Sequence, residues 1–393
     1  MFLKSRMATL CAMLSCMLCI VLGSFAEGTV SVLSDENEEI HRQTGVSEAA
    51  ETIRFGDVSI AADADELDLS GIPALSAVEL AAKLGRMNNV KTVALQTWDI
   101  PREDMRDLLR VFPHINFDWN VTVSGFLMNS TAEKIDFGET VIADGDDLID
   151  ALTCLPRLRV LHTYASILNR EQMAYLWETY PDMEFGWTLS FAKRTLRTDA
   201  VTFSTMNNST KSPRFTGADF EVLKYCKNLV ALDLGHNKIG TIDWLAELPQ
   251  LRVLILADNK LEDISVLAEL PNLEYVELFM NKIRDISPLA NMPNLLDLNL
   301  CRTMIKSNDI TPLLTNQNLQ RLWISYAGLS NDQMQTLREG LPNCVMEFKA
   351  TSSTAAGWRD HERYDKYREG FLTGVYVPFD GTETTRPPLP KKK

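Results

Sequence analysis

The sequence predicts an α/β solenoid with a parallel β-sheet on its concave side and helices or turns on its convex side. Two internal repeats lead to this prediction. From about residue 228 to 325, one pattern recurs with its Asn slot at Asn237, Asn259 and Asn281, which gives a 22-residue period. Upstream, a longer pattern occurs twice in succession. Units this short cannot bury their apolar faces alone, so they must stack on one another.

Each 22-residue unit has two halves with different predicted roles. The first half reads L-x-x-L-x-L-x-x-N, as in Leu251 to Asn259. Its leucines alternate as in a strand and point inward, and the Asn caps backbone groups where the chain leaves the strand. The second half, such as Asp285-Ile-Ser-Pro-Leu289, forms the convex turn. Thr303 and Ala327 replace the Asn in the last units, and this departure predicts the approach to a cap.

The pattern resembles the leucine-rich repeat. The phrase N-x-I-x-D-I-x-P-L in particular resembles the short repeat of bacterial internalin-like surface proteins, and the match spans about residues 228–325. The resemblance implies a curved solenoid whose concave sheet binds other macromolecules. It implies no catalysis, so we expect that the chain is not an enzyme.

Residues 60–205 are predicted to hold degenerate repeats of the same solenoid. The same interval separates Met105 from Met173 and Pro113 from Pro181, and each Pro begins a similar aromatic phrase. Each copy of this 68-residue duplication predicts strand, helix, strand, helix and an extended aromatic stretch whose rings belong to the core. A partial third copy over 332–348 serves as the C-terminal cap of the regular repeats, 206–348. We expect one continuous stack, with an insertion or bend at the polar linker that starts at Asn207.

Residues 1–26 are predicted to be a signal peptide. Lys4 and Arg6 precede an apolar run, and Ser24-Phe25-Ala26 resembles a cleavage site. We therefore expect a secreted or cell-surface protein. A retained membrane anchor and lipidation at a Cys of the apolar run are the alternatives, and an uncleaved N-terminus is the only predicted membrane contact. Residues 27–59 are acidic and poor in aromatics, which predicts a flexible spacer.

Composition excludes several classes of function. The net charge of −14 disfavours binding to nucleic acid. His361-Glu362 begins like the zinc-protease motif H-E-x-x-H, but Asp365 stands in place of the second His. Nothing in the sequence calls for a metal or a cofactor. The four cysteines of the mature chain are scattered, which favours buried thiols over zinc ligands or disulfides; they are Cys154, Cys226, Cys301 and Cys344.

The candidate site lies between the inward leucines of the regular strands. There the variable residues align in columns across successive repeats, and large aromatic side chains gather beside charged ones. Exposed aromatics with an Arg and a charged rim are typical of a binding hot spot. We predict that a protein or another surface macromolecule binds here, with Glu277 and Arg302 setting its orientation. The predicted binding residues are Tyr275, Glu277, Phe279, Met280, Asn299, Arg302, Trp323 and Tyr326.

The C-terminal extension, 349–393, leaves one alternative open for this site. The alternating charges of 358–371 predict a helix, the stretch 371–379 predicts a strand, and the Pro- and Lys-rich end predicts a disordered tail. If this extension covers the aromatic columns, or if the rings pack on one another, the patch is not a binding surface. The function would then be that of a structural cell-envelope scaffold or, least favoured, an enzyme with its site in the degenerate half.

Overall fold

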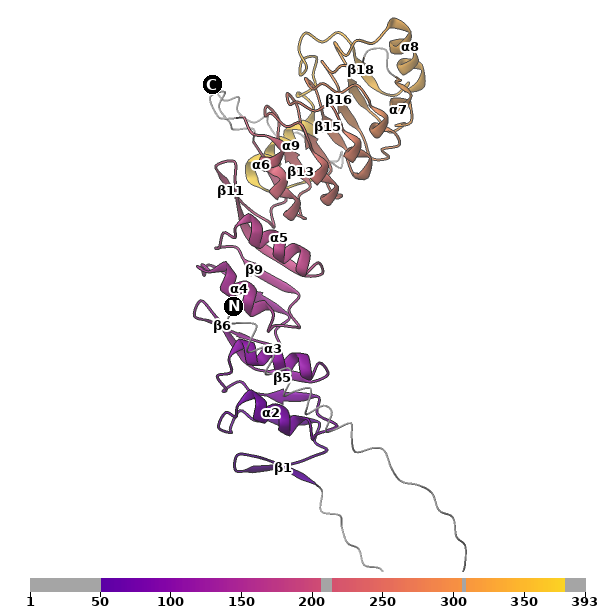
Figure 1. Cartoon of the computed structure of the whole chain (residues 1–393). Coiled ribbons are helices and arrows are strands. Elements are labelled where there is room, and N and C mark those ends of the chain that lie inside the picture. The colour runs from indigo at the N-terminus through magenta and orange to yellow at the C-terminus, as the bar shows by residue number, and fades with distance from the viewer. Residues whose placement is uncertain (1–50, 206–213, 306–308, 379–393) are drawn as a thin grey trace, which may run out of the picture. The chain divides into compact units, whose positions relative to one another are not determined.

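The computed structural model describes residues 51–205, 214–305 and 309–378 (Figure 1). The predicted signal peptide, most of the acidic spacer, the linker at Asn207 and the basic tail lie outside these residues. The predicted boundary of the spacer at residue 59 is wrong, because a β-hairpin of strands β1 (Thr52–Phe55) and β2 (Val58–Ala61) already begins the ordered fold.

Three hairpins mark the duplicated unit. The other two are β6 (Asn120–Val123) with β7 (Phe126–Asn129), and the end of β10 (Glu184–Phe191) with β11 (Arg194–Arg197). Their first strands begin pairing at Thr52, Asn120 and Thr188, which are separated by the same interval as the duplicated Met and Pro residues. The duplicated unit therefore includes a hairpin that the sequence pattern did not reveal.

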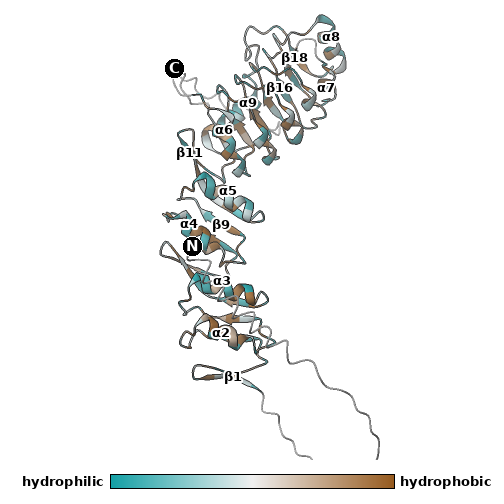
Figure 2. Ribbon diagram, in the orientation of Figure 1, coloured by the Kyte–Doolittle hydropathy of each residue, from teal (hydrophilic) through white to brown (hydrophobic). Residues whose placement is uncertain are grey.

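Between the hairpins lie two small parallel sheets with helices on one side. The first sheet has the order β3 (Glu66–Asp68), β4 (Thr92–Ala94), β5 (Asn116–Asp118), and the second contains β8 (Lys134–Asp136), β9 (Val160–Thr163) and β10. The predicted strand–helix alternation is present here. In Figure 2 helices α2 and α3 carry both hydrophobic and hydrophilic residues, as amphipathic helices do. The helices are α2 (Ala77–Leu84), α3 (Arg102–Val111), α4 (Gly145–Leu152) and α5 (Arg170–Thr179).

The regular repeats build one seven-stranded parallel sheet with short helical turns behind it. The strands follow chain order: β12 (Thr202–Ser204), β13 (Ala231–Asp233), β14 (Val253–Ile255), β15 (Tyr275–Glu277), β16 (Asp297–Asn299), β17 (Arg321–Trp323) and β18 (Val345–Glu347). This arrangement confirms the predicted fold class. The convex elements are α6 (Gly217–Phe220), η1 (Glu221–Tyr225), η2 (Asp243–Glu247), η3 (Ser265–Glu269), η4 (Ser287–Leu289), α7 (Thr311–Leu314) and α8 (Asn331–Gly340).

The Asn slot has the predicted capping role. The Asn259 side chain donates to the carbonyls of Leu234 and Leu256, both at 3.0 Å, and accepts from the Ile239 N–H at 3.0 Å. Asn281 makes the corresponding bonds one repeat later. Because each Asn bonds to its own repeat and the preceding one, the ladder fixes the stacking of the units.

The C-terminal extension packs on the sheet. Helix α9 (Glu362–Thr373) begins within the predicted helical stretch and contacts β12 and β13 (Figure 1). The predicted strand over 371–379 is wrong, because its first residues complete the helix. Gly374 then ends α9 with a left-handed φ of 79°, and residues 375–378 have no regular secondary structure.

The four cysteines of the described residues are free thiols, and all but the half-buried Cys344 are buried. This state agrees with the prediction of small apolar side chains rather than disulfides. Burial raises the pKa of the Cys301 thiol to about 11, so this thiol stays protonated and unreactive at neutral pH.

Candidate functional site

The parallel register places the predicted site residues side by side. Glu277 pairs with Asn299, and Asn299 pairs with Trp323, while Tyr275 lies two residues before Glu277 on the same strand. The columns derived from the repeat are therefore correct. Neighbouring strands lie about 4.8 Å apart, which brings these side chains into one surface.

Five of the eight predicted residues are buried, so the predicted exposure of the patch is wrong at these positions. Tyr275, Glu277 and Asn299 are 0 % exposed, and Phe279 and Trp323 are 4 % exposed. The cover is the C-terminal extension, the alternative that the sequence left open. The face between the inward leucines is thus a second core instead of a free surface.

Aromatic rings form the centre of this second core. The ring of Trp358 lies 5.4 Å from Tyr275 and 5.2 Å from Trp323, and Tyr367 of α9 lies 5.1 Å from Tyr275. Trp358 and Tyr367 are themselves 0 % and 1 % exposed. Burial of rings this large contributes roughly 1.5–3 kcal/mol each to stability, so the extension is an integral part of the fold.

The carboxylate of Glu277 is neutralised by residues of the extension. It accepts hydrogen bonds from the Tyr275 hydroxyl at 2.5 Å, the Trp358 Nε1–H at 2.7 Å and the Arg359 guanidinium at 2.8 Å. Burial is the largest single influence on Arg359 and acts to lower its pKa, but the charge and hydrogen bond of Glu277, together with the neighbouring Tyr364 and Tyr275, raise the pKa overall. The Arg359 guanidinium and the Glu277 carboxylate therefore form an ion pair inside the fold.

A second buried carboxylate, Asp297, holds two further arginines. Arg321 lies 2.8 Å and Arg363 of α9 lies 2.9 Å from its oxygens. Two polar groups of the predicted site bond to backbone carbonyls of the extension: the Asn299 amide donates to Ser353 at 2.8 Å and the Trp323 indole donates to Ala355 at 2.9 Å. Asn299, Trp323 and the two buried carboxylates Glu277 and Asp297 thus each contact residues of the extension.

The other three predicted residues stay exposed at the edge of the covered face. Met280, Arg302 and Tyr326 belong to a column that we name the rim column, in which each residue precedes the Asn slot or its replacement. All its members have a left-handed backbone with φ between 50° and 61°: His236, Asp258, Met280, Arg302 and Tyr326.

The repeat requires this backbone conformation, but not these side chains. The N–H groups of His236, Asp258, Met280 and Arg302 each donate to a carbonyl of the next repeat at 2.8–2.9 Å, which holds the turn. A left-handed φ favours Gly or Asn and is costly for larger residues. Large side chains at these positions therefore need an explanation beyond the turn itself.

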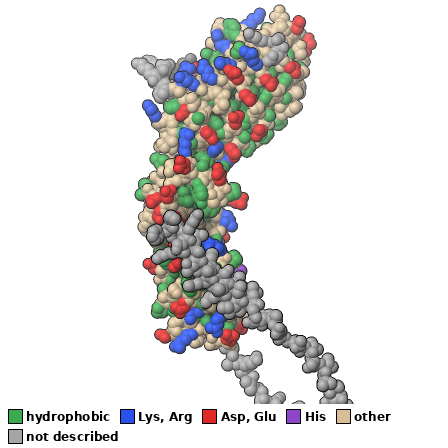
Figure 3. Space-filling view, viewed as in Figure 1, with side chains coloured by type: hydrophobic (Ala, Val, Ile, Leu, Met, Phe, Trp, Pro, Cys, Tyr) green, Lys and Arg blue, Asp and Glu red, His purple; other side chains and the backbone are tan. Residues whose placement is uncertain are grey.

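The rim column presents an aromatic group beside a cation. Tyr326 is 60 % and Met280 is 44 % exposed, and the Arg302 guanidinium lies 4.7 Å over the Tyr326 ring. At the other end of the column, His236 Nδ1 and Asp258 Oδ2 are 3.0 Å apart. Acidic and basic side chains are interspersed over the face of the regular repeats seen in Figure 3.

The described residues hold no cluster of three or more His, Cys, Asp or Glu side chains that could bind a metal ion. Within the same residues, every helix is too short or too polar to cross a bilayer.

The residues that close the concave face were missed by the sequence analysis. Trp358, Arg359, Arg363 and Tyr367 were predicted only to belong to a helix, from the charge pattern of 358–371, and none was named as a contact of the site. Their signal was the density of aromatic and Arg residues within this short stretch, which is unusual for a solvated helix.

Comparison with known proteins identifies the repeats. The family model described as leucine rich repeats (2 copies) matches residues 227–269 and 249–291. The leucine-rich repeats predicted from the sequence are therefore confirmed. Among curated proteins, no sequence matches the chain significantly.

Solved structures of bacterial leucine-rich repeat proteins are similar to the chain. An internalin (InlF) of Listeria monocytogenes is 20 % identical over 69 % of this chain, with a TM-score of 0.35, and the match covers 64 % of that protein, less than two thirds. Internalin C2 of the same organism is 19 % identical, with 70 % and 91 % of the two chains covered and a TM-score of 0.32. A leucine-rich repeat protein of Leptospira interrogans is 16 % identical, with 68 % and 74 % covered and a TM-score of 0.33.

Proposed function

We propose that this internalin-like leucine-rich repeat protein is exported and binds a protein partner through its rim column. Leucine-rich repeats serve in general to bind proteins or other macromolecules. The observation that carries the proposal is the exposure of Met280 and Tyr326 at positions where the backbone favours Gly or Asn. Such side chains have a backbone cost and are only partly buried, so we infer that their use lies in what they contact.

Three features of the rim column support binding. Tyr and Arg are enriched in hot spots of protein interfaces, and Arg302 already lies on the Tyr326 ring, which limits the entropy lost when a partner docks. The neighbouring concave face is filled by the chain's own extension, so a partner meets the rim column first. Of the eight residues proposed from the sequence, the partner then contacts Met280, Arg302 and Tyr326.

Export rests on the N-terminal sequence. Lys4 and Arg6, the apolar run Met7–Leu22 and the small residues around Ala26 are the three parts of a signal peptide. N-terminal sequencing of the exported protein should find Glu27 first. An exported form that retains Met7–Leu22 would support a membrane anchor instead, and one that starts at a lipid-modified Cys would support lipidation.

Partner binding can be tested with matched surface variants. The immobilised mature chain should retain a protein that the Met280→Ala/Tyr326→Ala variant binds at least about tenfold more weakly, as expected for hot-spot residues. Tyr175→Ala is the control, because Tyr175 is a similarly exposed tyrosine, 46 % accessible, on helix α5. If all three forms retain the same protein equally, the rim column is not the interface. If none retains a protein, the scaffold hypothesis is favoured.

A further inference from the structure

The convex turns of successive repeats share one capping arrangement. Asp263, Asp285 and Asp309 each accept a hydrogen bond from the backbone N–H two residues later, at Ser265, Ser287 and Thr311, with distances of 2.8–2.9 Å. The residue after that is Val266, Pro288 or Pro312. These three repeats provide an internal standard for the convex turn.

One repeat departs from this standard at three positions. Thr241 stands where the others have the capping Asp, Asp243 stands where they have Ser or Thr, and Trp244 stands where they have Val or Pro. The acidic side chain of this turn thus stands two residues later than in the other repeats, outside the capping position.

The changes leave polar groups without partners. Asp243 makes no hydrogen bond or ion pair with any residue that the structure describes, and the buried Nε1–H of Trp244 has no acceptor among the same residues. A lost cap and an unpaired buried N–H both cost stability. This turn therefore lacks a stabilising cap that the convex turns of the other three repeats have.

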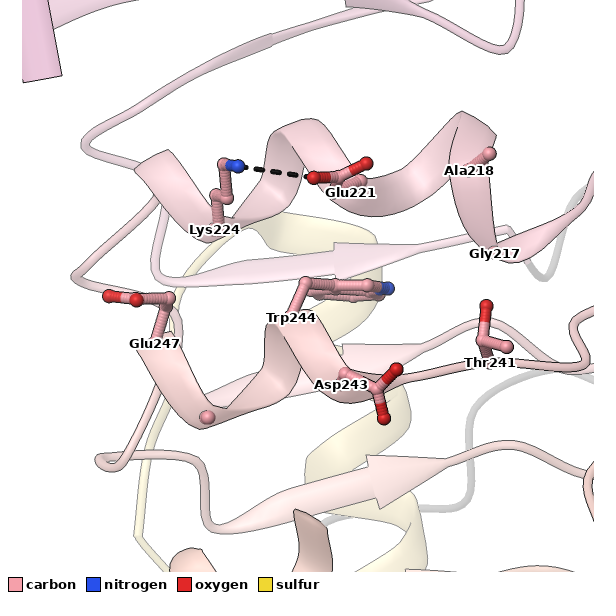
Figure 4. Close-up of a pocket in the computed structure, with 9 residues that line it drawn as sticks. Gly217, Ala218, Glu221, Lys224, Thr241, Asp243, Trp244 and Glu247 are labelled. Carbon is pink, nitrogen blue, oxygen red and sulfur yellow. Dashed lines mark hydrogen bonds and ion pairs between the residues drawn. The ribbon is translucent and has the colours of Figure 1, made fainter. Parts of the chain in front are cut away.

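All three altered residues line one cavity of about 400 Å³ (Figure 4). In Figure 4 the indole of Trp244 extends across the space between the Gly217–Lys224 segment and the Thr241–Asp243 segment. A Cβ on Gly217 would lie 2.4 Å from the Thr241 carbonyl oxygen, so only glycine permits this close approach of the two walls. The volume falls within the range of about 300–1,000 Å³ typical of ligand pockets.

We propose that this cavity binds a neutral pyranose sugar, with its ring against the Trp244 indole. The apolar C–H face of a sugar ring matches an aromatic face, and sugar hydroxyls both donate and accept hydrogen bonds. The cavity offers both kinds of partner. Lys224 donates, Asp243 accepts, and the Thr241 hydroxyl can do either.

The charges in the cavity select against other ligands. Three carboxylates line it, those of Glu221, Asp243 and Glu247, against the one ammonium of Lys224, so anionic ligands are repelled. Among the described residues, a cationic ligand would find only the exposed carboxylate of Asp243 unpaired, because the other two carboxylates already form ion pairs. Glu221 lies 3.1 Å from Lys224, and Glu247 lies 2.6 Å from Lys227. A neutral polyhydroxylated ligand fits what remains.

The test uses the mature chain on an array of neutral oligosaccharides built from glucose, galactose, mannose and N-acetylglucosamine. Titration calorimetry with a bound oligosaccharide then compares the wild type with two variants, Trp244→Val and the repeat-restoring triple variant Thr241→Asp/Asp243→Ser/Trp244→Val. We expect each to weaken binding at least about tenfold, which corresponds to about 1.4 kcal/mol. The triple variant should melt no lower than the wild type, because it regains the cap of its sister repeats.

Two controls separate this site from the rim column. Ser265→Ala alters the corresponding position of the next repeat and should leave sugar binding unchanged, as should Met280→Ala/Tyr326→Ala. The proposal is overturned if no neutral oligosaccharide binds, if the triple variant binds as tightly as the wild type, or if a polyamine competes for the site. Loss of sugar binding in the rim variant would also contradict it.

Discussion

At the residue scale, Asn259 shows how a single polar side chain can fix the register of a solenoid. It is 3 % exposed and bonds to backbone groups of two repeats. Asn259→Ala should lower the free energy of unfolding by roughly 1–3 kcal/mol, because it leaves buried carbonyl and N–H groups unpaired. Urea denaturation measures this, with the exposed neighbour Lys260→Ala as a control that should cost little. Equal losses would show that the Asn ladder is not structural.

Trp323 and Tyr326 are close neighbours in the chain, but their replacement by Ala should change the stability of the protein by very different amounts. Trp323 is 4 % exposed under the extension, whereas Tyr326 is 60 % exposed. Trp323→Ala should cost about 3–5 kcal/mol, as large-to-small changes in a core do, and Tyr326→Ala less than about 0.5 kcal/mol. Thermal melting of the two variants distinguishes core from surface. A stable Trp323→Ala protein would mean that the concave face is open in solution.

Asp233 makes the stability depend on pH. Burial raises the pKa of its carboxyl, although hydrogen bonds from Gly235 and Ser204 oppose the shift. Because the pKa is higher in the folded state, the protonated carboxyl contributes stability to the fold. This contribution is fully present below the pKa of the unfolded state, near 3.8, and is lost as pH rises through the pKa of the folded state. The stability of Asp233→Asn relative to the wild type should therefore increase as pH rises from the unfolded value towards neutrality. Urea midpoints across this range test it, and a constant difference would contradict it.

At the scale of elements, the C-terminal extension acts as part of the core rather than as a surface addition. Its Trp358 and Arg359 are separated from their partner Glu277 by 81 and 82 residues. The extension brings both rings and cations to a face that would otherwise expose aromatics and two carboxylates. The stability of the sheet thus depends on the packing of the extension against it.

A chain that stops after Ala350 should lose this second core. Exposure of Tyr275, Phe279 and Trp323 alone should cost about 5 kcal/mol or more, at roughly 1.5–3 kcal/mol for each ring. Calorimetry should show a much lower melting temperature, together with aggregation. A chain that stops after Pro378 keeps every contact named above and should melt like the wild type. An unchanged melting temperature of the chain that stops after Ala350 would show that the extension is a dispensable cover.

At the scale of the whole molecule, the degenerate and regular repeats share one apolar core. Rings pack across the two halves, with Trp187 5.7 Å from Tyr225 and Phe191 6.2 Å from Phe220. Strand β12 precedes residues 206–213 and pairs with β13, which follows them. The folded state of each half therefore depends on packing against the other half.

Cleavage of the chain between residues 206 and 213 should consequently not release two stable domains. The separated fragments would expose the edges of β12 and β13 and the rings between them. We expect each fragment alone to aggregate or to lack a cooperative transition, and the mixture to regain one. Calorimetry and size-exclusion chromatography measure this. Two soluble fragments that melt independently would refute a shared core.

The sequence by itself determined the repeat, its strands and its Asn ladder. These features are local and periodic: alternation of Leu251, Leu254 and Leu256 defines a strand wherever it occurs, and 22-residue spacing then aligns the columns. Helix α9 was also predictable, because its charges alternate within helical reach. The hairpin of β1 and β2 was not, since its short strands are recognisable only beside their two structural copies.

Only the tertiary structure decided which columns face solvent. Tyr275 and Tyr326 both occupy variable positions of the repeat. Tyr275 is buried by Trp358, whereas Tyr326 lies outside the cover. Exposure depends on which distant segment packs on a face, and no periodicity encodes that pairing. The same holds for the cavity at Trp244, whose walls meet because Gly217 allows a close approach. Local pattern thus determined the scaffold, and long-range packing determined the surfaces left for binding.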